Sequence, residues 1–246
     1  MKLPFIEAFS HGGRFSHRQR LLVQHSTEGP MSRGNARALA GPAWFGGAKA
    51  GTSAHAIFDP GEGIEMVKPD RIAFHVGPGG NGFSLGTEHC GRTALTKEQW
   101  LSPDARSMLR RSAEWNAQYA RTFDIPPRWL SLTELAAGKS GFCTHNDIRL
   151  VFGGTTHSDP GPNFPYAWYM SQVQAFHAGK PAPEDHVPIT EAEFHRIRLE
   201  VITALNDPTH QYLQDELAPL KAALKALQDG QARLAEAVRR LGGPVD

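Results

Sequence analysis

Five short apolar runs in the first ninety residues constrain the fold of this chain more than any other feature. Glycine-rich turns separate the runs, which cover residues 21–24, 54–58, 64–67, 72–76 and 83–87. Runs of this length between turn residues are typical of β-strands. We therefore expect residues 20–88 to supply the strands of a β-sheet.

A long amphipathic helix should follow these strands. Residues 96–99 have the sequence of a capping box, and Ser102 with Pro103 offers an N-cap and a proline in the first turn. We expect a helix from Pro103 to about Phe123, with one face packed on the sheet and its arginines in solvent. The packed face carries Met108, Ser112, Trp115 and Tyr119, and the arginines are Arg106, Arg110 and Arg111. Strands followed by helices that pack over them indicate an α/β fold with a mixed central β-sheet flanked by helices.

The composition changes near residue 177. Residues 177–188 contain three prolines and few apolar side chains, which is typical of a linker. A capping box at residues 190–193 begins a helix that should end near Leu205. From Leu217 onward a heptad pattern places leucines at Leu220, Leu227, Leu234 and Leu241. We expect a domain at 1–176, a linker at 177–188 and a helical, coiled-coil region at 189–246.

The heptad leucines need a second helix to cover them, because one exposed helix cannot bury them. Self-association would make the chain a homo-oligomer through its C-terminal heptads. The alternative is a monomeric hairpin, in which the heptad helix folds back on the helix at 190–205.

Charge and composition exclude several classes of function. The chain has 26 Lys and Arg residues against 25 Asp and Glu, so its net charge of +1 lacks the basic excess of nucleic-acid binders. Pro4 and Glu7 interrupt the apolar N-terminus, and no apolar run approaches membrane length, so we expect neither a signal peptide nor a membrane partner. With only Cys90 and Cys143, we expect reduced thiols and a cytoplasmic product.

Three residues that lie far apart in the sequence have the chemistry of a metal site. His25 follows the run at 21–24, and His145 and Asp159 lie on one loop-bearing segment. Two neutral imidazoles and one carboxylate supply three ligands to zinc and leave the fourth position for water, as hydrolytic zinc sites require. A lone histidine after a strand is more often a buried hydrogen-bonding residue, so the assignment depends on the three motifs occurring together.

Glu88 and His157 are the candidate catalytic residues. Glu88 ends the run at 83–87, where a partly buried carboxylate could take a proton from water and pass it to a leaving nitrogen. His157 lies two residues before Asp159 and could donate a hydrogen bond to a developing oxyanion. The alternative for Glu88 is a surface carboxylate on an edge strand.

Six short motifs occur in order between residues 18 and 176. They are His25-Ser26-Thr27, Ser53-Ala54-His55, Phe74-His75-Val76-Gly77, Ser84-Leu85-Gly86-Thr87-Glu88, His145-Asn146-Asp147-Ile148 and Asp159-Pro160-Gly161-Pro162. Together they resemble the signatures of the zinc-dependent N-acetylmuramoyl-L-alanine amidases, which have the amidase-2 and peptidoglycan-recognition fold. Within this family the chain is most similar to endolysins of phages that infect actinobacteria, given the sequence from Phe152 to Pro165.

The resemblance implies a hydrolase that cleaves the amide between N-acetylmuramic acid and L-alanine in bacterial peptidoglycan. It would be made in the host cytoplasm and reach the cell wall after holin-type release. The two histidines and Asp159 would bind Zn²⁺, with Glu88 as the acid/base residue. His157 stands where relatives often carry lysine, and a histidine brings a positive charge only when protonated, so we expect activity to depend on pH near neutrality. Ala54 replaces a tyrosine of the small phage amidases, which leaves proton transfer to Glu88.

Four further residues are expected to line the substrate groove, namely Trp44, His55, His75 and Asn81. For His55 and His75 a structural hydrogen-bonding role is an open alternative. The alternative function is a peptidoglycan-binding protein without turnover and with a coiled-coil tail, and a third is a targeting head on an oligomeric structural protein. Some relatives that bind without cutting carry cysteine at the third ligand position, where this chain has Asp159, which favours hydrolysis.

Overall fold

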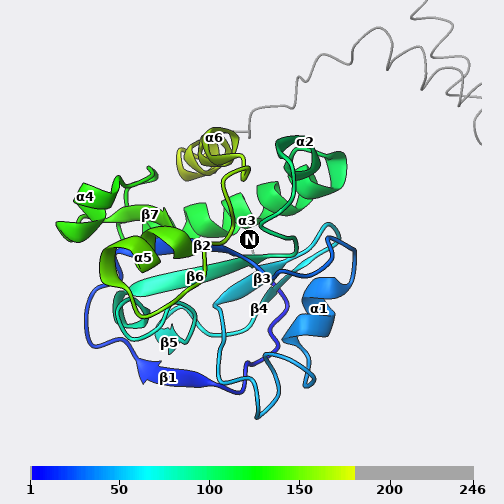
Figure 1. Ribbon diagram of the computed structural model, residues 1–246, viewed down its shortest axis with the longest axis horizontal. Coiled ribbons are helices and arrows are strands. Elements are labelled where there is room, and N and C mark those ends of the chain that lie inside the picture. Colours follow the sequence, from blue (N-terminus) through cyan, green and yellow to red (C-terminus); the bar gives the residue numbers. More distant parts are fainter. Residues whose placement is uncertain (1, 181–246) are drawn as a thin grey trace, which may run out of the picture. The chain divides into compact units, whose positions relative to one another are not determined.

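A five-stranded sheet forms the centre of the structure, a computed structural model that describes residues 2–180 (Figure 1). Its strands, in spatial order, are β4 (Gly63–Glu65), β3 (Ala56–Phe58), β6 (Ser84–His89), β2 (Leu21–Ser26) and β7 (Gly141–Thr144). β2 pairs in parallel with β6 and β7, and β3 pairs in parallel with β6, whereas β4 is antiparallel to β3. The sheet is therefore mixed, which confirms the predicted fold class.

Two strands differ from the prediction. The run at 72–76 forms only the short β5 (Arg71–Ala73), which lies outside the central sheet and pairs antiparallel with β1 (His11–Arg14). β7 is not predicted from the sequence, because its four residues are all buried and show no alternation of apolar and polar side chains.

The predicted long helix is α3 (Pro103–Thr122), and it packs against the central sheet. The predicted caps are confirmed: residues 96–99 form the capping box of α2 (Lys97–Trp100), and Ser102 accepts a hydrogen bond from the backbone nitrogen of Ala105. On the packed face Met108, Ser112 and Trp115 are buried and Tyr119 is half-buried.

The prediction that the arginines of α3 remain in solvent is wrong. All three are half-buried, because other segments of the domain cover α3. One of these segments is α6 (Tyr166–His177), which the sequence does not predict and which packs along α3 (Figure 1). Arg110 donates to Oε1 of Gln172 on α6, and Arg111 donates to the carbonyl oxygen of Asp59.

Three shorter helices and one 3-10 helix complete the described part. They are α1 (Asn35–Ala40), α4 (Leu132–Ala136), α5 (His145–Phe152) and η1 (Asn81–Phe83). The loop-bearing segment that carries His145 and Asp159 begins with a helix, because the eight residues after Thr144 form α5, and the loop follows it. Thr144 is the N-cap, and Asp147 completes a capping box with it.

Cys90 and Cys143 are free and buried, as predicted. Burial raises the pKa of the Cys90 thiol to about 12 and raises the pKa of Cys143 well above its usual value. No helix in the described part of the chain is long and apolar enough to cross a membrane. Most of the predicted linker and the whole region at 189–246 lie outside the described residues.

Candidate metal centre

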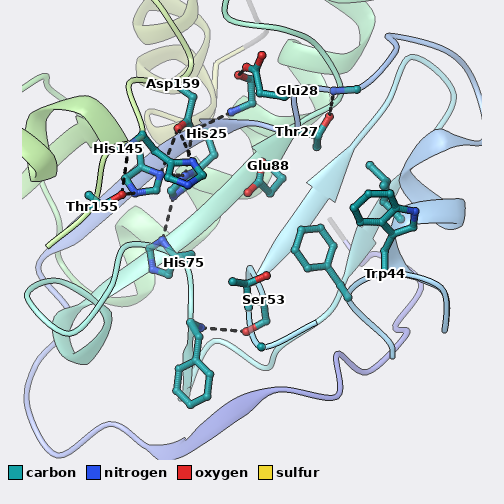
Figure 2. Close-up of a pocket in the computed structure, with 18 of the residues that line it drawn as sticks. His25, Thr27, Glu28, Trp44, Ser53, His75, Glu88, His145, Thr155 and Asp159 are labelled. Carbon is teal, nitrogen blue, oxygen red and sulfur yellow. Dashed lines mark hydrogen bonds and ion pairs between the residues drawn. The ribbon is translucent and has the colours of Figure 1, made fainter. Parts of the chain in front are cut away.

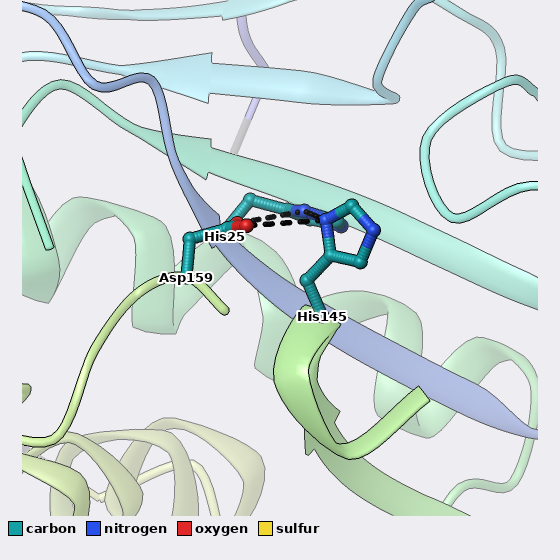
Figure 3. Close-up of side chains that lie close together, drawn as sticks. All are labelled: His25, His145 and Asp159. Carbon is teal, nitrogen blue, oxygen red and sulfur yellow. Dashed lines mark hydrogen bonds and ion pairs between the residues drawn. The ribbon is translucent and has the colours of Figure 1, made fainter. Parts of the chain in front are cut away.

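The candidate site lies where three parallel strands present their carboxyl ends at one edge of the sheet. His25 is the fifth residue of β2 and Glu88 is the fifth residue of β6, and the two residues are paired in register. β7 ends at Thr144, so His145 follows as the first residue of α5. Asp159 reaches the same point from the loop after α5 (Figure 3). Ligand sites at the carboxyl ends of parallel strands are common in α/β proteins.

The side chains of His25, His145 and Asp159 meet in a compact, buried cluster (Figure 3). Nδ1 of His25 lies 3.1 Å from Nδ1 of His145 and 3.2 Å from Oδ2 of Asp159. Nδ1 of His145 lies 3.2 Å from Oδ1 of Asp159. Tetrahedral ligands of zinc lie about 3.3 Å from one another, because each is about 2.0–2.1 Å from the ion. The two imidazole nitrogens and the Asp159 carboxylate, which meets each ring with a different oxygen, therefore lie close enough together to hold a zinc ion.

The outer nitrogens of both histidines have hydrogen-bond partners. Nε2 of His25 lies 2.9 Å from Nδ1 of His75, and Nε2 of His75 lies 3.0 Å from Oγ of Ser84, which donates to the carbonyl oxygen of Gly80. If Nδ1 of His25 keeps its lone pair for a metal, Nε2 must carry the proton and donate it to His75. Partners of this kind orient ligand histidines and select their tautomer.

His145, the other candidate ligand, has an equivalent partner. Nε2 of His145 lies 3.1 Å from Oγ1 of Thr155 in the loop after α5.

The position of the His75 ring also requires a glycine in β6, because a Cβ on Gly86 would overlap the ring. The sequence therefore places glycine in the middle of a buried strand, where it would otherwise weaken the strand.

Burial and hydrogen bonding set the charges of the cluster. Burial lowers the pKa of His25, so the neutral imidazole that binds metals is favoured. Burial opposes ionisation of Asp159, but its hydrogen bonds with His145 and His25 outweigh this effect and lower the pKa of its carboxyl group. The backbone nitrogen of Ser26 also donates to Oδ2 of Asp159, at 3.2 Å.

Glu88 lies in the same groove as the cluster (Figure 2). β6 lies between β3 and β2, so the alternative of a surface carboxylate on an edge strand is wrong. Burial is the main cause that raises the pKa of Glu88 well above its usual value, and the charges of Asp159 and Glu28 add to it. Oε2 of Glu88 is buried and has no hydrogen-bond partner among the described residues. An unpartnered buried oxygen of this kind is costly unless a substrate or water uses it.

His157 stands at the solvent side of the cluster. Its side chain is 69% exposed, its Nδ1 lies 3.8 Å from Oδ1 of Asp159, and its ring is stacked on that of His145 at 5.0 Å. His157 therefore lies beside the three candidate ligands and is not one of them.

A groove of about 910 Å³ surrounds the cluster (Figure 2). Of the four residues predicted to line it, Trp44, His75 and Asn81 do so, and Trp44 is 63% exposed. His55 does not line the groove. It is fully buried, its Nε2 donates to the carbonyl oxygen of Arg71, and its Nδ1 accepts from the backbone nitrogen of Gly86. For His55 the structural role is therefore the correct one.

Two further residues that support the site were not predicted. Thr155 lies in a glycine-rich loop, where a hydroxyl group gives no distinctive signal. Glu28 has a positive φ of 54°, and its Oε1 accepts hydrogen bonds from Oγ of Ser26 and from the backbone nitrogen and hydroxyl of Thr93. Its place before Gly29-Pro30, where a turn is expected, is the one signal that the sequence offers.

A comparison with a solved structure at a TM-score above 0.5 supports the fold. The hydrolase AmiA of Staphylococcus aureus, in complex with its ligand, is 19% identical with a TM-score of 0.55, over 74% of this chain and 89% of that chain. A selenomethionine derivative of AmpD is 22% identical with a TM-score of 0.47, over 71% and 93% of the two chains. LysC, an N-acetylmuramoyl-L-alanine amidase from Clostridium intestinale URNW, is 15% identical with a TM-score of 0.45. The match covers 71% of this chain and 98% of LysC.

No curated protein matches the chain. Residues 16–162 match the family described as N-acetylmuramoyl-L-alanine amidase. This match covers more than half of the chain and includes every residue of the cluster. The chain therefore belongs to the N-acetylmuramoyl-L-alanine amidase family.

Proposed function

We propose that the protein is a zinc-dependent peptidoglycan hydrolase that cleaves the amide between N-acetylmuramic acid and L-alanine. One observation carries the proposal: two buried imidazole nitrogens 3.1 Å apart, each 3.2 Å from an oxygen of the buried Asp159 carboxylate, share a groove with the unpartnered Oε2 of Glu88. A metal site without a proton-transfer group would serve binding alone, so the buried carboxylate favours turnover.

The residues of the groove would divide the reaction between them. His25, His145 and Asp159 would hold the zinc, which when bound supplies a Lewis acid for the attacking water and the scissile carbonyl. Glu88, with its raised pKa, can accept a proton from water and return it to the nitrogen of the leaving L-alanine. The exposed ring of His157 can donate a hydrogen bond to the carbonyl oxygen as negative charge develops there.

Two residues that line the groove can contact such a substrate. Trp44 presents a large exposed apolar surface at one end, to which a sugar ring can pack (Figure 2). Asn81 lines the groove, but its Oδ1 already accepts from the backbone nitrogens of His75 and Val76. We therefore assign substrate contact to Trp44 and to the amide nitrogen of Asn81, and we assign His75 to the support of His25.

The finer parts of the proposal concern origin, location and the C-terminal region. The motif resemblance supports a phage endolysin that is made in the host cytoplasm and acts on the wall after holin-type release. The heptad leucines support self-association through residues 189–246, with a wall-binding hairpin as the alternative. Light scattering on the full chain distinguishes the two, because a mass equal to that of one chain at high concentration contradicts self-association.

The chemical identity of the new chain ends tests the proposed activity. Purified peptidoglycan digested with the zinc-loaded protein should gain free amino groups on L-alanine and should gain no reducing sugars. Digestion that produces reducing sugars would instead indicate glycoside cleavage, and tight binding to peptidoglycan with no new ends would support the non-catalytic binding protein. Protein stripped with a chelator and reloaded with zinc provides the matched control.

A further inference from the structure

A network of buried polar side chains lies between the central sheet and α3, on the face of the sheet opposite the groove. Every member is fully buried, and the members are Gln24, Thr87, His89, Ser112, Asn116 and Tyr169. Buried polar groups of this kind are costly unless all their hydrogen bonds are made. Here they connect β2, β6, α3 and α6.

Asn116 of α3 joins the two strands that carry the site. Its Oδ1 accepts from Nε2 of Gln24 on β2 at 3.3 Å and from Oγ1 of Thr87 on β6 at 3.2 Å. Its Nδ2 donates to the carbonyl oxygen of Ser112 at 3.0 Å and to the hydroxyl of Tyr169 at 2.9 Å. The tyrosine hydroxyl in turn donates to Oε1 of Gln24 at 2.9 Å. One amide group therefore links both strands to α3 and α6.

The register of the sheet gives this link a consequence for the site. Gln24 is paired with Thr87, and the next pair along the strands is His25 with Glu88. Because successive side chains of a strand point to opposite faces, Gln24 and Thr87 face α3 while His25 and Glu88 face the groove. The oxygen of Asn116 thus holds the two strands together one residue before the ligand histidine and the proton-transfer carboxylate.

His89 adds a second link to the same ligand. Its Nδ1 lies 2.9 Å from the carbonyl oxygen of His25, which can only accept, so Nδ1 carries the proton. Its Nε2 must then accept from Oγ of Ser112, at 2.7 Å. The backbone of His25 is therefore held from α3 through Ser112 and His89, independently of the contacts that its side chain makes in the groove.

We propose that Asn116 is a positioning residue, which sets the separation of His25 and Glu88 from behind the sheet and thereby controls both metal affinity and turnover. The inference rests on the proposed zinc hydrolase. Its alternative is that the network contributes only to stability. The two accounts differ in what happens when Gln24, Thr87 and Asn116 are replaced together by apolar groups of similar shape. The hydroxyl of Tyr169 then keeps Oγ of Ser112, at 2.8 Å, as its partner, so stability can be restored without restoring the hydrogen bonds between the strands and α3.

The test compares four variants of the full chain. Asn116→Leu removes the link but leaves Gln24 and Thr87 without their partner, and Thr87→Val removes one donor with little change of shape. The triple variant Gln24→Leu/Thr87→Val/Asn116→Leu replaces all three groups. Leu109→Ala is the matched control, because Leu109 is a buried apolar residue of α3. Each is measured for zinc affinity by competition with a chromogenic chelator, for urea midpoint, and for kcat and KM of L-alanine release from a soluble muropeptide.

Positioning predicts that Asn116→Leu and the triple variant both lose about tenfold or more in zinc affinity and in kcat, with KM changed little, even where the triple variant recovers the wild-type urea midpoint. Thr87→Val should show a smaller loss of the same kind, and Leu109→Ala should lower the urea midpoint alone. Recovery of zinc affinity and kcat in the triple variant, or an equal loss in Leu109→Ala, would overturn the inference. Wild-type protein that binds zinc but releases no L-alanine would instead overturn the proposed function, and the zinc affinities would still decide the role of Asn116.

Discussion

Acid should destabilise the described domain in part through His55, which is buried without a charged partner. Burial lowers the pKa of His55 to about 4, although the carbonyl oxygen of Arg71 partly opposes the shift. In the unfolded chain the imidazole regains its ordinary pKa near 6.5. Between these two values the unfolded state binds one more proton than the folded state, so the free energy of unfolding falls as the pH falls.

The size of this effect follows from the shift. The stability that the neutral ring of His55 contributes is fully present above pH 6.5 and is lost below pH 4, with a total of about 3 kcal/mol. Between pH 6 and 5 the free energy of unfolding should fall by about 1 kcal/mol per pH unit from this cause. His55→Gln removes the titrating ring, so its unfolding free energy should depend on pH less steeply by this amount in this window. The variant should also be less stable at pH 7, because glutamine cannot reproduce both hydrogen bonds of the ring.

Urea unfolding of the metal-free protein, followed by tryptophan fluorescence, measures the slope. All five tryptophans lie within the described residues, so the signal reports on this domain. His17→Gln, which replaces an exposed histidine, serves as the matched control and should keep the wild-type slope. Equal slopes for wild type and His55→Gln between pH 6 and 5 would refute the reasoning.

Three further perturbations follow from the same contacts. Gly86→Ala should displace the ring of His75 and so lower zinc affinity about 10- to 100-fold, as measured by isothermal titration; unchanged affinity would show that His75 does not orient His25. Trp44→Ala should raise KM for peptidoglycan fragments several-fold while kcat and the urea midpoint change little, because the ring is mostly exposed in the groove, and an unchanged KM would remove Trp44 from the substrate site. Cys90, whose pKa is raised to about 12 by burial, should react with iodoacetamide at pH 8 only after unfolding, and fast labelling of the native protein would contradict its buried position.

Local patterns in the sequence predict the framework of the domain well. Hydrophobic runs with turn residues at their ends locate the strands that contain Leu21 and Leu85, and cap chemistry at Ser102 locates the start of α3. α6 and β7 were missed, because their formation depends on packing rather than on a local pattern. Apolar and polar residues of α6 do not follow a clear amphipathic pattern, and β7 consists of four buried residues whose pairing with β2 no local pattern indicates.

The site is predictable to the extent that its residues lie within recognisable motifs. His25, His145 and Asp159 could be proposed as ligands from their chemistry, and the structure brings all three together. Their mutual distance depends on three parallel strands that end at one edge, which no single motif encodes. The roles of Thr155 and Asn116 depend on tertiary contacts between segments far apart in the chain, and so does the structural role of His55.

The role of Glu88 in the zinc-loaded protein tests the account most directly. Glu88→Gln preserves the shape of the side chain but removes its capacity to move a proton. The variant should fold and bind one zinc per chain, yet release L-alanine termini from peptidoglycan at least about a hundredfold more slowly than the wild type. Release of L-alanine termini by zinc-loaded Glu88→Gln at the wild-type rate would contradict the assignment of Glu88, and release by the wild type after complete removal of metal would contradict the zinc mechanism itself.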